Sequence, residues 1–504
     1  MNVLLALTCL AAAQGQEMKP KKIVLIAGSL DTHPKETHEY ERNVILLRHC
    51  LQTSLKNVRV ETHFNGWPAD AATLDDADTI FFTSGGSERG NAERNPIFVG
   101  DRLAALEKQI ARGCGLIQFH WSTFNPVQHQ EKILDWVGGF FDAESGPDGK
   151  WYSKLSTREW QTTLPTPDHP IARGVKPFAV KEEFYYNLRF REMKPILNCS
   201  EGTVGYAVER KDGGRGFGFT GGHFYANWWN PDFRKLVLNA IAWTAKIEVP
   251  AAGVESTLDD PVRITILTGH HYPAHEWKVT TPPFIQVVEQ DPRVRITVTE
   301  DVHDLKLENQ HALVINYMNW GKPGLTDDQK KMLIDFFQRG GGLVVFHGAT
   351  GVWNDSICPK DSHWPEFRDR ITARWWASGS GHDDFGPFRV ENVAPDHEIT
   401  RGLPAFDTQD ELYVKLGGEN GVPLVAAPSK VAGRQEPLAW AHAYGKGRVF
   451  VTALGHGAGS IRSAGALFRR ATVWAAGAPP LSFDPPAQQT EKTIDRPGTW
   501  KPKN

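Results

Sequence analysis

Residues 111–123 read ARGCGLIQFHWST, and residues 338–350 read QRGGGLVVFHGAT. In each stretch glycines end a helical pattern, a short apolar run typical of a buried strand follows, and a histidine comes directly after that run. These histidines are His120 and His347. The shared pattern predicts that one fold occurs twice in this chain of 504 residues.

Four more pairs of segments repeat in the same order. They are PDHPIARGV (167–175) with PDHEITRGL (395–403), EEFYYNL (182–188) with DELYVKL (410–416), GRGFGFTGGHF (214–224) with GRVFVTALGHG (447–457), and LNAIAWTA (238–245) with RRATVWAA (469–476). The offset between partners stays near about 230 residues throughout. We therefore interpret the chain as a tandem duplication.

The duplication predicts two domains, at 21–248 and 262–478. Between them, VPAAGVESTLDDP (249–261) has the Pro, Gly and polar residues of a linker. The last segment, 479–504, carries several prolines and little apolar periodicity, so we expect it to be extended or disordered. The sequence leaves open whether the two halves pack as a pseudo-dimer.

Within each half, strand patterns such as KKIVLIAG (21–28) alternate with helical patterns such as RNVILLRHCLQTSL (42–55). This alternation is typical of an α/β fold with a mainly parallel sheet and helices on both faces. In open sheets of this kind ligands bind outside the carboxyl ends of the strands. We therefore look for a site in the loops that follow the strands.

The first 16 residues, MNVLLALTCLAAAQGQ, are apolar and end in small residues. They predict a signal peptide at 1–16 and a secreted or periplasmic protein, with lipidation at Cys9 as an alternative. The stretch is shorter than the about 20 residues of a membrane span. The formal net charge of -3 gives no reason to expect nucleic acid or an anionic membrane as a partner.

The other cysteines are scattered through the chain. They are Cys50, Cys114, Cys199 and Cys358. Without a CxxC pair, they suggest neither a disulfide framework nor a zinc–thiolate site. We expect buried free thiols.

Histidine and acidic residues gather in the loops after the predicted strands. The candidates are His33, His38, Glu39, His120, Glu183, Tyr185 and His223 in the first half, and His270, His271, His275, Glu276, His347, Glu411, Tyr413 and His456 in the second. Several His with a carboxylate, drawn from separate strand ends, suit zinc or another divalent metal. Without metal, the same groups could act as general acid and base.

From these candidates we assign each half its own roles. The predicted metal ligands are His38, His120 and His223 in the first half and His271, His347 and His456 in the second. The predicted catalytic residues are Glu39, Glu183, Tyr185, Glu276, Glu411 and Tyr413. The predicted substrate-binding residues are Trp121, Trp228 and Trp229, which follow strand-end histidines and could stack on sugar rings.

Each assignment has a structural alternative. A histidine after a strand is often a hydrogen-bonded turn residue, and the tryptophans could simply pack a core. His169 and His397, in the two PDH segments, fit a turn or cap role better than catalysis. Neither half has GxGxxG after its first strand, a Walker-type motif or HExxH, so nucleotide binding and zincin chemistry have little support.

The segments GHHYPAHEW (269–277), GGGLVVFHGATG (340–351), PDHEITRGLP (395–404) and DELY (410–413) resemble the ThuA-like (trehalose utilisation) family, and AGSLDTHPKETHEYER (27–42) and FHWSTF (119–124) resemble a variant of it. The resemblance implies a class I glutamine amidotransferase-like fold, a flavodoxin-like three-layer sandwich in each half. Amidotransferases carry a nucleophilic Cys where this chain has His120 and His347, so glutamine hydrolysis is not expected. The family association is with carbohydrate catabolism.

These observations lead to one functional hypothesis and one rival. The chain is expected to be an exported enzyme, a metal-dependent hydrolase or lyase acting on a small carbohydrate or keto-sugar derivative. The rival is a non-catalytic carbohydrate-binding or scaffold protein. The first half has Ser29, Leu30 and Asp31 where the second has His270 and His271, so the two sites need not bind the same metal.

Overall fold

The computed structural model describes residues 19–88, 91–147, 150–485 and 496–503. The predicted signal peptide and Cys9 lie outside these residues, as does the middle of the predicted tail. The chain divides into two compact units. One holds the chain up to Ser29 with Cys50–Ser256, and the other holds Leu30–His49 with the chain from Thr257 onward.

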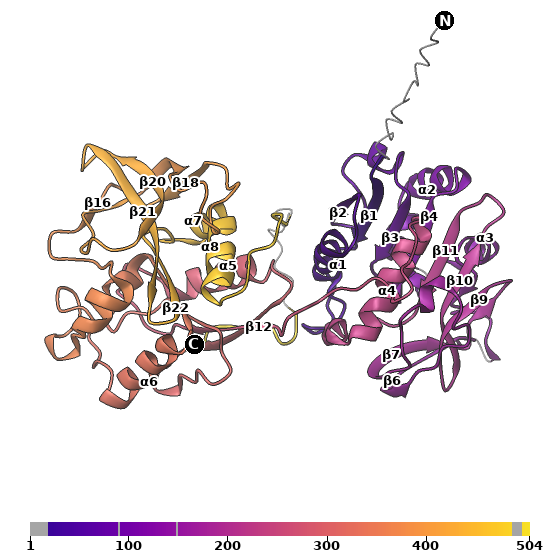
Figure 1. The fold of residues 1–504 in the computed structure, drawn as a ribbon, viewed down its shortest axis with the longest axis horizontal. Coiled ribbons are helices and arrows are strands. Elements are labelled where there is room, and N and C mark those ends of the chain that lie inside the picture. The colour runs from indigo at the N-terminus through magenta and orange to yellow at the C-terminus, as the bar shows by residue number, and fades with distance from the viewer. Residues whose placement is uncertain (1–18, 89–90, 148–149, 486–495, 504) are drawn as a thin grey trace, which may run out of the picture. The chain divides into compact units, whose positions relative to one another are not determined.

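The first unit contains a seven-stranded sheet in the order β2-β1-β3-β4-β11-β10-β9 (Figure 1). The strands are β1 (Lys21–Ala27), β2 (Val58–His63), β3 (Thr79–Thr83), β4 (Gly115–Phe119), β9 (Lys194–Cys199), β10 (Gly202–Glu209) and β11 (Arg215–Phe219). The first five in the sheet order are parallel, and β10 and β9 continue it antiparallel. Two separate antiparallel strand pairs, β6 (Lys154–Gln161) with β7 (Ala179–Tyr186) and β5 (Gly139–Phe140) with β8 (Arg189–Phe190), complete the unit.

Helices lie against both faces of the first sheet. The first half of the chain contains four α-helices: α1 (Tyr40–Ser54), α2 (Arg102–Ala111), α3 (Gln130–Val137) and α4 (Pro231–Thr244), counted over the described residues. A Cβ atom on Gly115 would meet the Thr244 carbonyl oxygen at 2.4 Å, and one on Gly216 would meet the Trp136 carbonyl oxygen at 1.9 Å. Gly216 pairs with Leu116, so it faces the side opposite to Gly115. The two glycines thus let α4 and α3 approach opposite faces.

The second unit repeats this sheet and extends it to nine strands, in the order β13-β12-β14-β15-β22-β21-β20-β17-β18. They are β12 (Val262–Leu267), β13 (Val294–Thr299), β14 (Ala312–Ile315), β15 (Gly342–Phe346), β17 (Gly386–Asn392), β18 (Phe406–Asp410), β20 (Val422–Ser429), β21 (Arg434–Tyr444) and β22 (Gly447–Thr452). A short pair, β16 (Gly381–His382) with β19 (Tyr413–Val414), stands apart. The first five strands in this order, β13-β12-β14-β15-β22, are parallel to one another. The remaining pairings, from β22 to β18, are antiparallel.

Alternation along β15 shows the three layers of the second unit. Val344 and Phe346 join a core that contains side chains of α5 (Trp277–Val288) and α8 (Gly465–Ala475). Leu343 and Val345 join a different core with α6 (Asp327–Gln338). The central strand is therefore buried on both faces, which explains its continuous apolar sequence. The short helix α7 (Ala458–Ser463) precedes α8.

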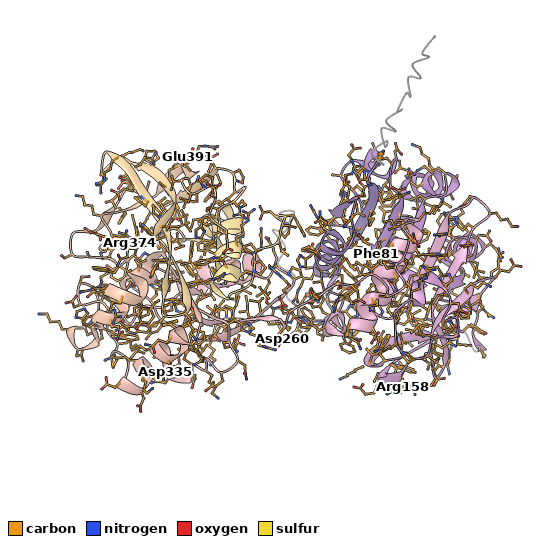
Figure 2. All side chains as sticks on the ribbon, viewed as in Figure 1. Phe81, Arg158, Asp260, Asp335, Arg374 and Glu391 are labelled. Atoms are coloured by element: carbon orange, nitrogen blue, oxygen red, sulfur yellow. The ribbon has the colours of Figure 1, made fainter. Side chains whose placement is uncertain are left out.

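The predicted fold class is confirmed: each half has a mainly parallel sheet with helices on both faces. Phe81 of β3, labelled in Figure 2, is fully buried in the first sheet, and Asp260 lies in the segment that connects the two sheets along the chain. Among the described residues, no helix combines the length and apolar composition needed to cross a bilayer. The loops that follow the carboxyl ends of β12, β15 and β22 carry candidate site residues of the second half.

Candidate metal centre

His347 stands at the elbow after β15, where the chain turns sharply. Its backbone has φ 49°, in the left-handed region that costs a non-glycine residue about 1 kcal/mol or more. Its ring is buried, and Nδ1 lies 2.7 Å from the Ala453 carbonyl oxygen. A carbonyl oxygen only accepts, so Nδ1 carries the proton and Nε2 is left with a lone pair. The elbow therefore presents an unprotonated nitrogen above the sheet.

Four side chains converge at this point: His275, His347, Glu411 and His456. His347 Nε2 lies 3.1 Å from His456 Nδ1 and 3.5 Å from a carboxylate oxygen of Glu411. The same oxygen lies 3.3 Å from His456 Nδ1 and 3.9 Å from His275 Nε2. His275, His347 and His456 come from the loops after the parallel strands β12, β15 and β22, as expected for a site at the ends of parallel strands. Glu411 follows β18, which pairs antiparallel with β17.

These distances fit a metal ion. Zinc holds nitrogen and oxygen ligands at about 2.1 Å, so adjacent tetrahedral ligands lie about 3.4 Å apart. The pairs that join His347, His456 and Glu411 match that spacing, and all four ligand atoms lie within 4.8 Å of one another. The hydrogen bond from His347 Nδ1 to Ala453 is the kind of outer contact that orients a metal-binding imidazole.

The electrostatics of the cluster favour an ionised carboxylate. Burial alone would raise the pKa of Glu411, but hydrogen bonds with His275, His347 and His456 hold it below its ordinary value. Burial lowers the pKa of His275, against the opposing effect of Glu411. The hydrogen bond with Glu411 raises the pKa of His456. Glu411 is thus an anion at neutral pH, and it sits among imidazole nitrogens.

Tyr413 is a buried residue whose hydroxyl contacts two histidines of the cluster. Its hydroxyl lies 3.0 Å from His347 Nε2 and 3.3 Å from His275 Nε2. Burial, with the nearby charge of Glu411, raises the pKa of this phenol well above its ordinary value. The hydroxyl therefore keeps its proton and can donate a hydrogen bond inside the site.

A further acidic residue, Asp410, is buried directly before Glu411. Its buried carboxylate accepts hydrogen bonds from the backbone N–H of Gly455 at 2.7 Å, of His456 at 3.1 Å and of Glu411 at 2.9 Å. One carboxylate thus holds the backbone of two candidate ligands. The signal in the sequence was the acidic pair DE at 410–411, which matches EE at 182–183.

The structure replaces one predicted ligand by a neighbour. His275, not His271, joins His347 and His456. The His271 ring turns back on its own backbone, where Nδ1 accepts from the Tyr272 N–H at 2.9 Å, and burial lowers its pKa well below the usual value. His270 Nε2 donates to the Trp320 carbonyl oxygen at 2.6 Å. Glu276 is exposed directly before α5.

The first half repeats the core of this arrangement. His120 has φ 54°, its Nδ1 donates to the Thr220 carbonyl oxygen at 2.8 Å, and its Nε2 lies 3.0 Å from the Tyr185 hydroxyl. The His223 ring packs edge-on at 5.4 Å from that of His120, and its Nδ1 lies 3.6 Å from a carboxylate oxygen of Glu183. The structure thus brings together four of the residues predicted for the first site.

Glu182 takes the place of Asp410 in the first half. It is fully buried and accepts from the N–H of Gly222 at 2.9 Å and of His223 at 3.0 Å. Burial raises the pKa of Glu182 to about 7, against the effect of these hydrogen bonds. Both halves therefore anchor the loop that carries the second histidine on a buried carboxylate.

The other predicted residues of the first half, His38 and Glu39, follow an acidic residue not assigned a role. Asp31 accepts from the Tyr40 hydroxyl at 2.8 Å, and its carboxylate lies 2.8 Å from His33 Nδ1 and 3.3 Å from His38 Nδ1. Asp31, His33 and His38 could themselves hold a cation. Glu39 is buried and forms an ion pair with Arg496 at 3.2 Å, which gives it a structural partner.

The three predicted sugar-stacking tryptophans differ in their surroundings. Trp228 is buried and stacks on Phe119 with ring centroids 5.6 Å apart. Trp121 is also buried, with the Arg94 guanidinium over its ring. Trp229 is half-buried beside Tyr225. Their role in substrate binding stays a prediction.

The PDH segments and the cysteines fit their structural interpretations. Nδ1 of His169 accepts from the N–H of Ile171 at 3.2 Å, and Nδ1 of His397 makes the matching bond at 3.2 Å, so both are caps of a turn. All four cysteines predicted to be buried thiols are buried, and Cys114, Cys199 and Cys358 are free. Burial raises the pKa of Cys114 to about 12, which makes it a poor nucleophile.

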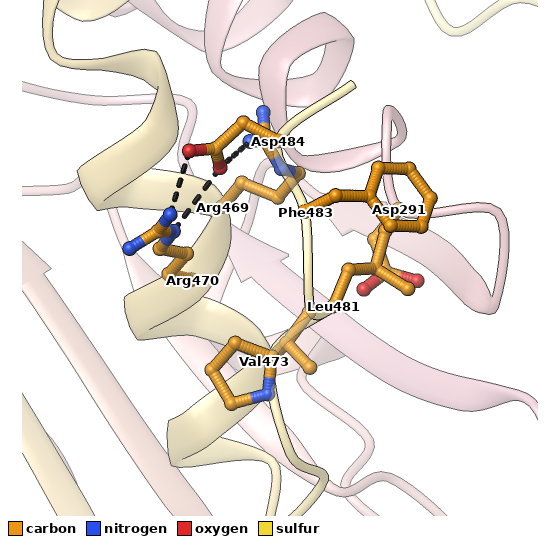
Figure 3. Close-up of a pocket in the computed structure, with 8 residues that line it drawn as sticks. Asp291, Arg469, Arg470, Val473, Leu481, Phe483 and Asp484 are labelled. Carbon is orange, nitrogen blue, oxygen red and sulfur yellow. Dashed lines mark hydrogen bonds and ion pairs between the residues drawn. The ribbon is translucent and has the colours of Figure 1, made fainter. Parts of the chain in front are cut away.

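One hollow on the surface of the second unit lies elsewhere. It is lined by Asp291 and by residues of α8 and the segment that follows, among them Arg469, Arg470 and Phe483 (Figure 3). Both arginines pair with Asp484, as the dashed lines of Figure 3 show. None of the four cluster residues lines it. Asp291 pairs with Arg293, so each charged side chain of this hollow has a partner, which is typical of a structural contact.

With this geometry established, comparison with known proteins identifies the family. A model of the ThuA family, described as trehalose utilisation, matches residues 31–244 and again residues 263–475. The chain belongs to the ThuA family. Its two ThuA matches confirm the tandem duplication, and the family supports a carbohydrate-related role. No curated protein matches the chain.

Several solved structures resemble one half of the chain. A ThuA-like protein from Parabacteroides merdae is 22% identical over 47% of this chain and 95% of its own, with a TM-score of 0.38. Another from Bacteroides uniformis is 17% identical over 45% and 98%, with a TM-score of 0.35. A cytoplasmic protein from Salmonella typhimurium is 15% identical over 44% and 99%, with a TM-score of 0.34.

Proposed function

We propose that this ThuA protein is a metal-assisted hydrolase or lyase that acts on a sugar or keto-sugar derivative. The observation that carries the proposal is the convergence of His275, His347, Glu411 and His456 at distances suited to one divalent ion. The family description supports a sugar-derived substrate. The site of the first half, with His120 and His223, would act in the same way.

Each residue of the second site has a chemical task. A divalent ion of the zinc type would need a fifth coordination position to stay open beside these four ligands, and there it would lower the pKa of a water or polarise a carbonyl. His347 offers Nε2 because Ala453 holds the proton on Nδ1. Glu411 supplies the negative charge. Tyr413 keeps its proton and can donate a hydrogen bond to an oxygen of the substrate.

Two alternatives remain to be separated from this proposal. The same His and Glu groups could act as acid and base without metal, since the raised pKa of His456 favours its protonated form beside Glu411. A non-catalytic carbohydrate-binding protein would need neither. Export from the cell stays a prediction.

Elemental analysis of the chain, purified without a His-tag and without added metal, tests the proposal first. We expect about one equivalent of zinc or a similar ion per working site. His347→Ala should lose the metal of the second site and its turnover, whereas the control His303→Ala, an exposed histidine hydrogen-bonded to Gln329, should lose neither. A folded wild-type chain that takes up no divalent metal would contradict the proposal.

A further inference from the structure

Two exposed aromatic side chains border the metal-ligand cluster of the second half. Phe385 is 54% exposed and Trp320 is 39% exposed, and they are the aromatic members of the strongly exposed hydrophobic side chains among the described residues. Single exposed hydrophobic residues are normal in proteins. Here, however, ring contacts connect both to the same cluster, Phe385 directly through His456 and Trp320 through Tyr272.

A continuous series of ring contacts links these two residues through the cluster. Trp320 packs edge-on against Tyr272 at 4.8 Å between centroids, and Tyr272 lies 5.9 Å from His275. The His275 ring lies 5.2 Å from that of His456, and Phe385 lies 5.6 Å from His456. Candidate ligands thus stand in the middle of the series, with aromatic rings at both ends.

The backbone on the Phe385 side is fixed by a buried carboxylate. Asp383, two residues earlier, accepts hydrogen bonds from the Ser429 hydroxyl at 2.7 Å and from the N–H of Lys430 at 2.7 Å and of Val431 at 3.1 Å. Its own N–H donates to the Leu412 carbonyl oxygen at 3.0 Å, next to Glu411. The segment that carries Phe385 is therefore tied to the segment that carries a candidate ligand.

The backbone on the Trp320 side is held in a comparable way. The Trp320 carbonyl oxygen accepts from His270, and the N–H of Met318 donates to the His270 carbonyl oxygen at 3.0 Å. The neighbouring Asn319 side chain accepts from the N–H of Trp353 at 2.9 Å. Exposed rings carried by a backbone that is held in place are suited to binding, because less conformational entropy is lost when a ligand covers them.

Aromatic faces of this kind bind the C–H faces of sugar rings, since both surfaces are apolar while the sugar hydroxyls point outward to water and polar groups. We propose that Phe385 on one side, and Tyr272 with Trp320 on the other, form two stacking platforms for a carbohydrate of at least two rings, whose linkage lies over the cluster. This inference rests on the proposed function and adds the residues that would hold the two rings of its substrate.

The test is a binding measurement on the full chain, which needs no turnover. Glucose, trehalose, maltose and cellobiose are titrated by calorimetry, with saturation-transfer NMR for weak binding. We expect at least one disaccharide to bind more tightly than glucose. Phe385→Ala and Trp320→Ala should each weaken that binding about five- to tenfold, because each removes one stacked ring. Val422→Ala, which truncates a residue 52% exposed, is the control.

Metal content, measured on the same samples, separates this inference from the proposed function. Tight disaccharide binding that both aromatic variants weaken would support the platforms, even in a chain that binds no metal. Wild-type affinity in Phe385→Ala and Trp320→Ala would overturn them. So would equal affinity for glucose and the disaccharides, or a metal-loaded wild-type chain that binds none of the four sugars.

Discussion

Gly348, the residue after His347, makes room for the cluster, and its replacement by alanine is the sharpest test of the site's geometry. A Cβ atom at this position would lie 2.6 Å from Cε1 of His271 and 2.8 Å from Nδ1 of His275. Ordinary contact begins at 3.4 Å, so the His271 ring would have to move by about 0.8 Å and the His275 ring by about 0.6 Å. The first half has Trp121 at the matching position, so this opening belongs to the second site.

The displacement sets the size of the effect. Overpacking of this kind in a well-packed region costs about 1–3 kcal/mol of unfolding free energy. A shift of about 0.6 Å in His275 is large beside a ligand distance of about 2.1 Å, so this ligand would leave the metal or bind it poorly. We therefore expect Gly348→Ala to fold, to lose about 1–3 kcal/mol, and to bind the ion at least about tenfold more weakly.

The assay pairs urea denaturation with a metal titration that uses a chromophoric chelator as competitor. Gly379→Ala is the matched control, because a Cβ atom there meets nothing within 4 Å. We expect this control to keep wild-type metal affinity. If Gly348→Ala also kept wild-type stability and metal affinity, His275 would not be a ligand and the packing argument would be wrong.

Three other substitutions give distinct results. Asp410→Asn should lower the unfolding free energy by about 2 kcal/mol and metal affinity by about tenfold or more, because it weakens the hydrogen bonds that hold the backbone of His456 and Glu411. Wild-type values in urea denaturation and in the metal titration would refute this role. Glu39→Gln should cost about 2 kcal/mol or more in denaturation but leave metal content unchanged, since it removes the anion beside buried Arg496; lost turnover at wild-type stability would instead support the predicted catalytic role. Burial, as the main cause, lowers the pKa of His169 from 6.5 to about 4 in the folded chain. As the pH falls, the unfolded chain therefore takes up this proton first, so the contribution of His169 to stability is present above pH 6.5 and is lost towards pH 4. His169→Asn, which keeps a capping acceptor, should flatten that loss in denaturation curves from pH 7 to pH 4, and identical pH profiles would contradict the assignment.

The sequence predicted which strand ends form the site better than it predicted which histidine of the loop after β12 takes part. His347 and His456 follow buried apolar strands directly, and the period of a strand fixes where such residues emerge. The loop after β12 has no such period. There the Tyr272 carbonyl accepts the N–H of His275, and His271 folds back on its own backbone, so the later histidine reaches the cluster. The spacing of the histidines in HHYPAH does not predict this turn geometry.

Asp410 and Glu182 were missed for a related reason. A carboxylate on a strand looks the same in the sequence whether it faces solvent or a loop, and only the fold shows that each of these two accepts hydrogen bonds from backbone N–H groups. Exposed aromatic residues such as Phe385 pose the same difficulty, because whether they can bind a ligand depends on which loops lie beside them in the fold. What a strand pattern specifies is local, whereas these contacts join segments far apart in the chain.

The duplication separates what the fold needs from what a site needs. Both halves keep a histidine at positive φ with Nδ1 bonded to a carbonyl and Nε2 bonded to a tyrosine hydroxyl. Glycine would relieve the strain at either elbow, so a purely structural role does not require histidine there. The next position has diverged between the halves, to Trp121 in the first and Gly348 in the second, whereas the histidine is present in both. A histidine that keeps its proton on Nδ1 and turns Nε2 to the site is what a metal ligand requires.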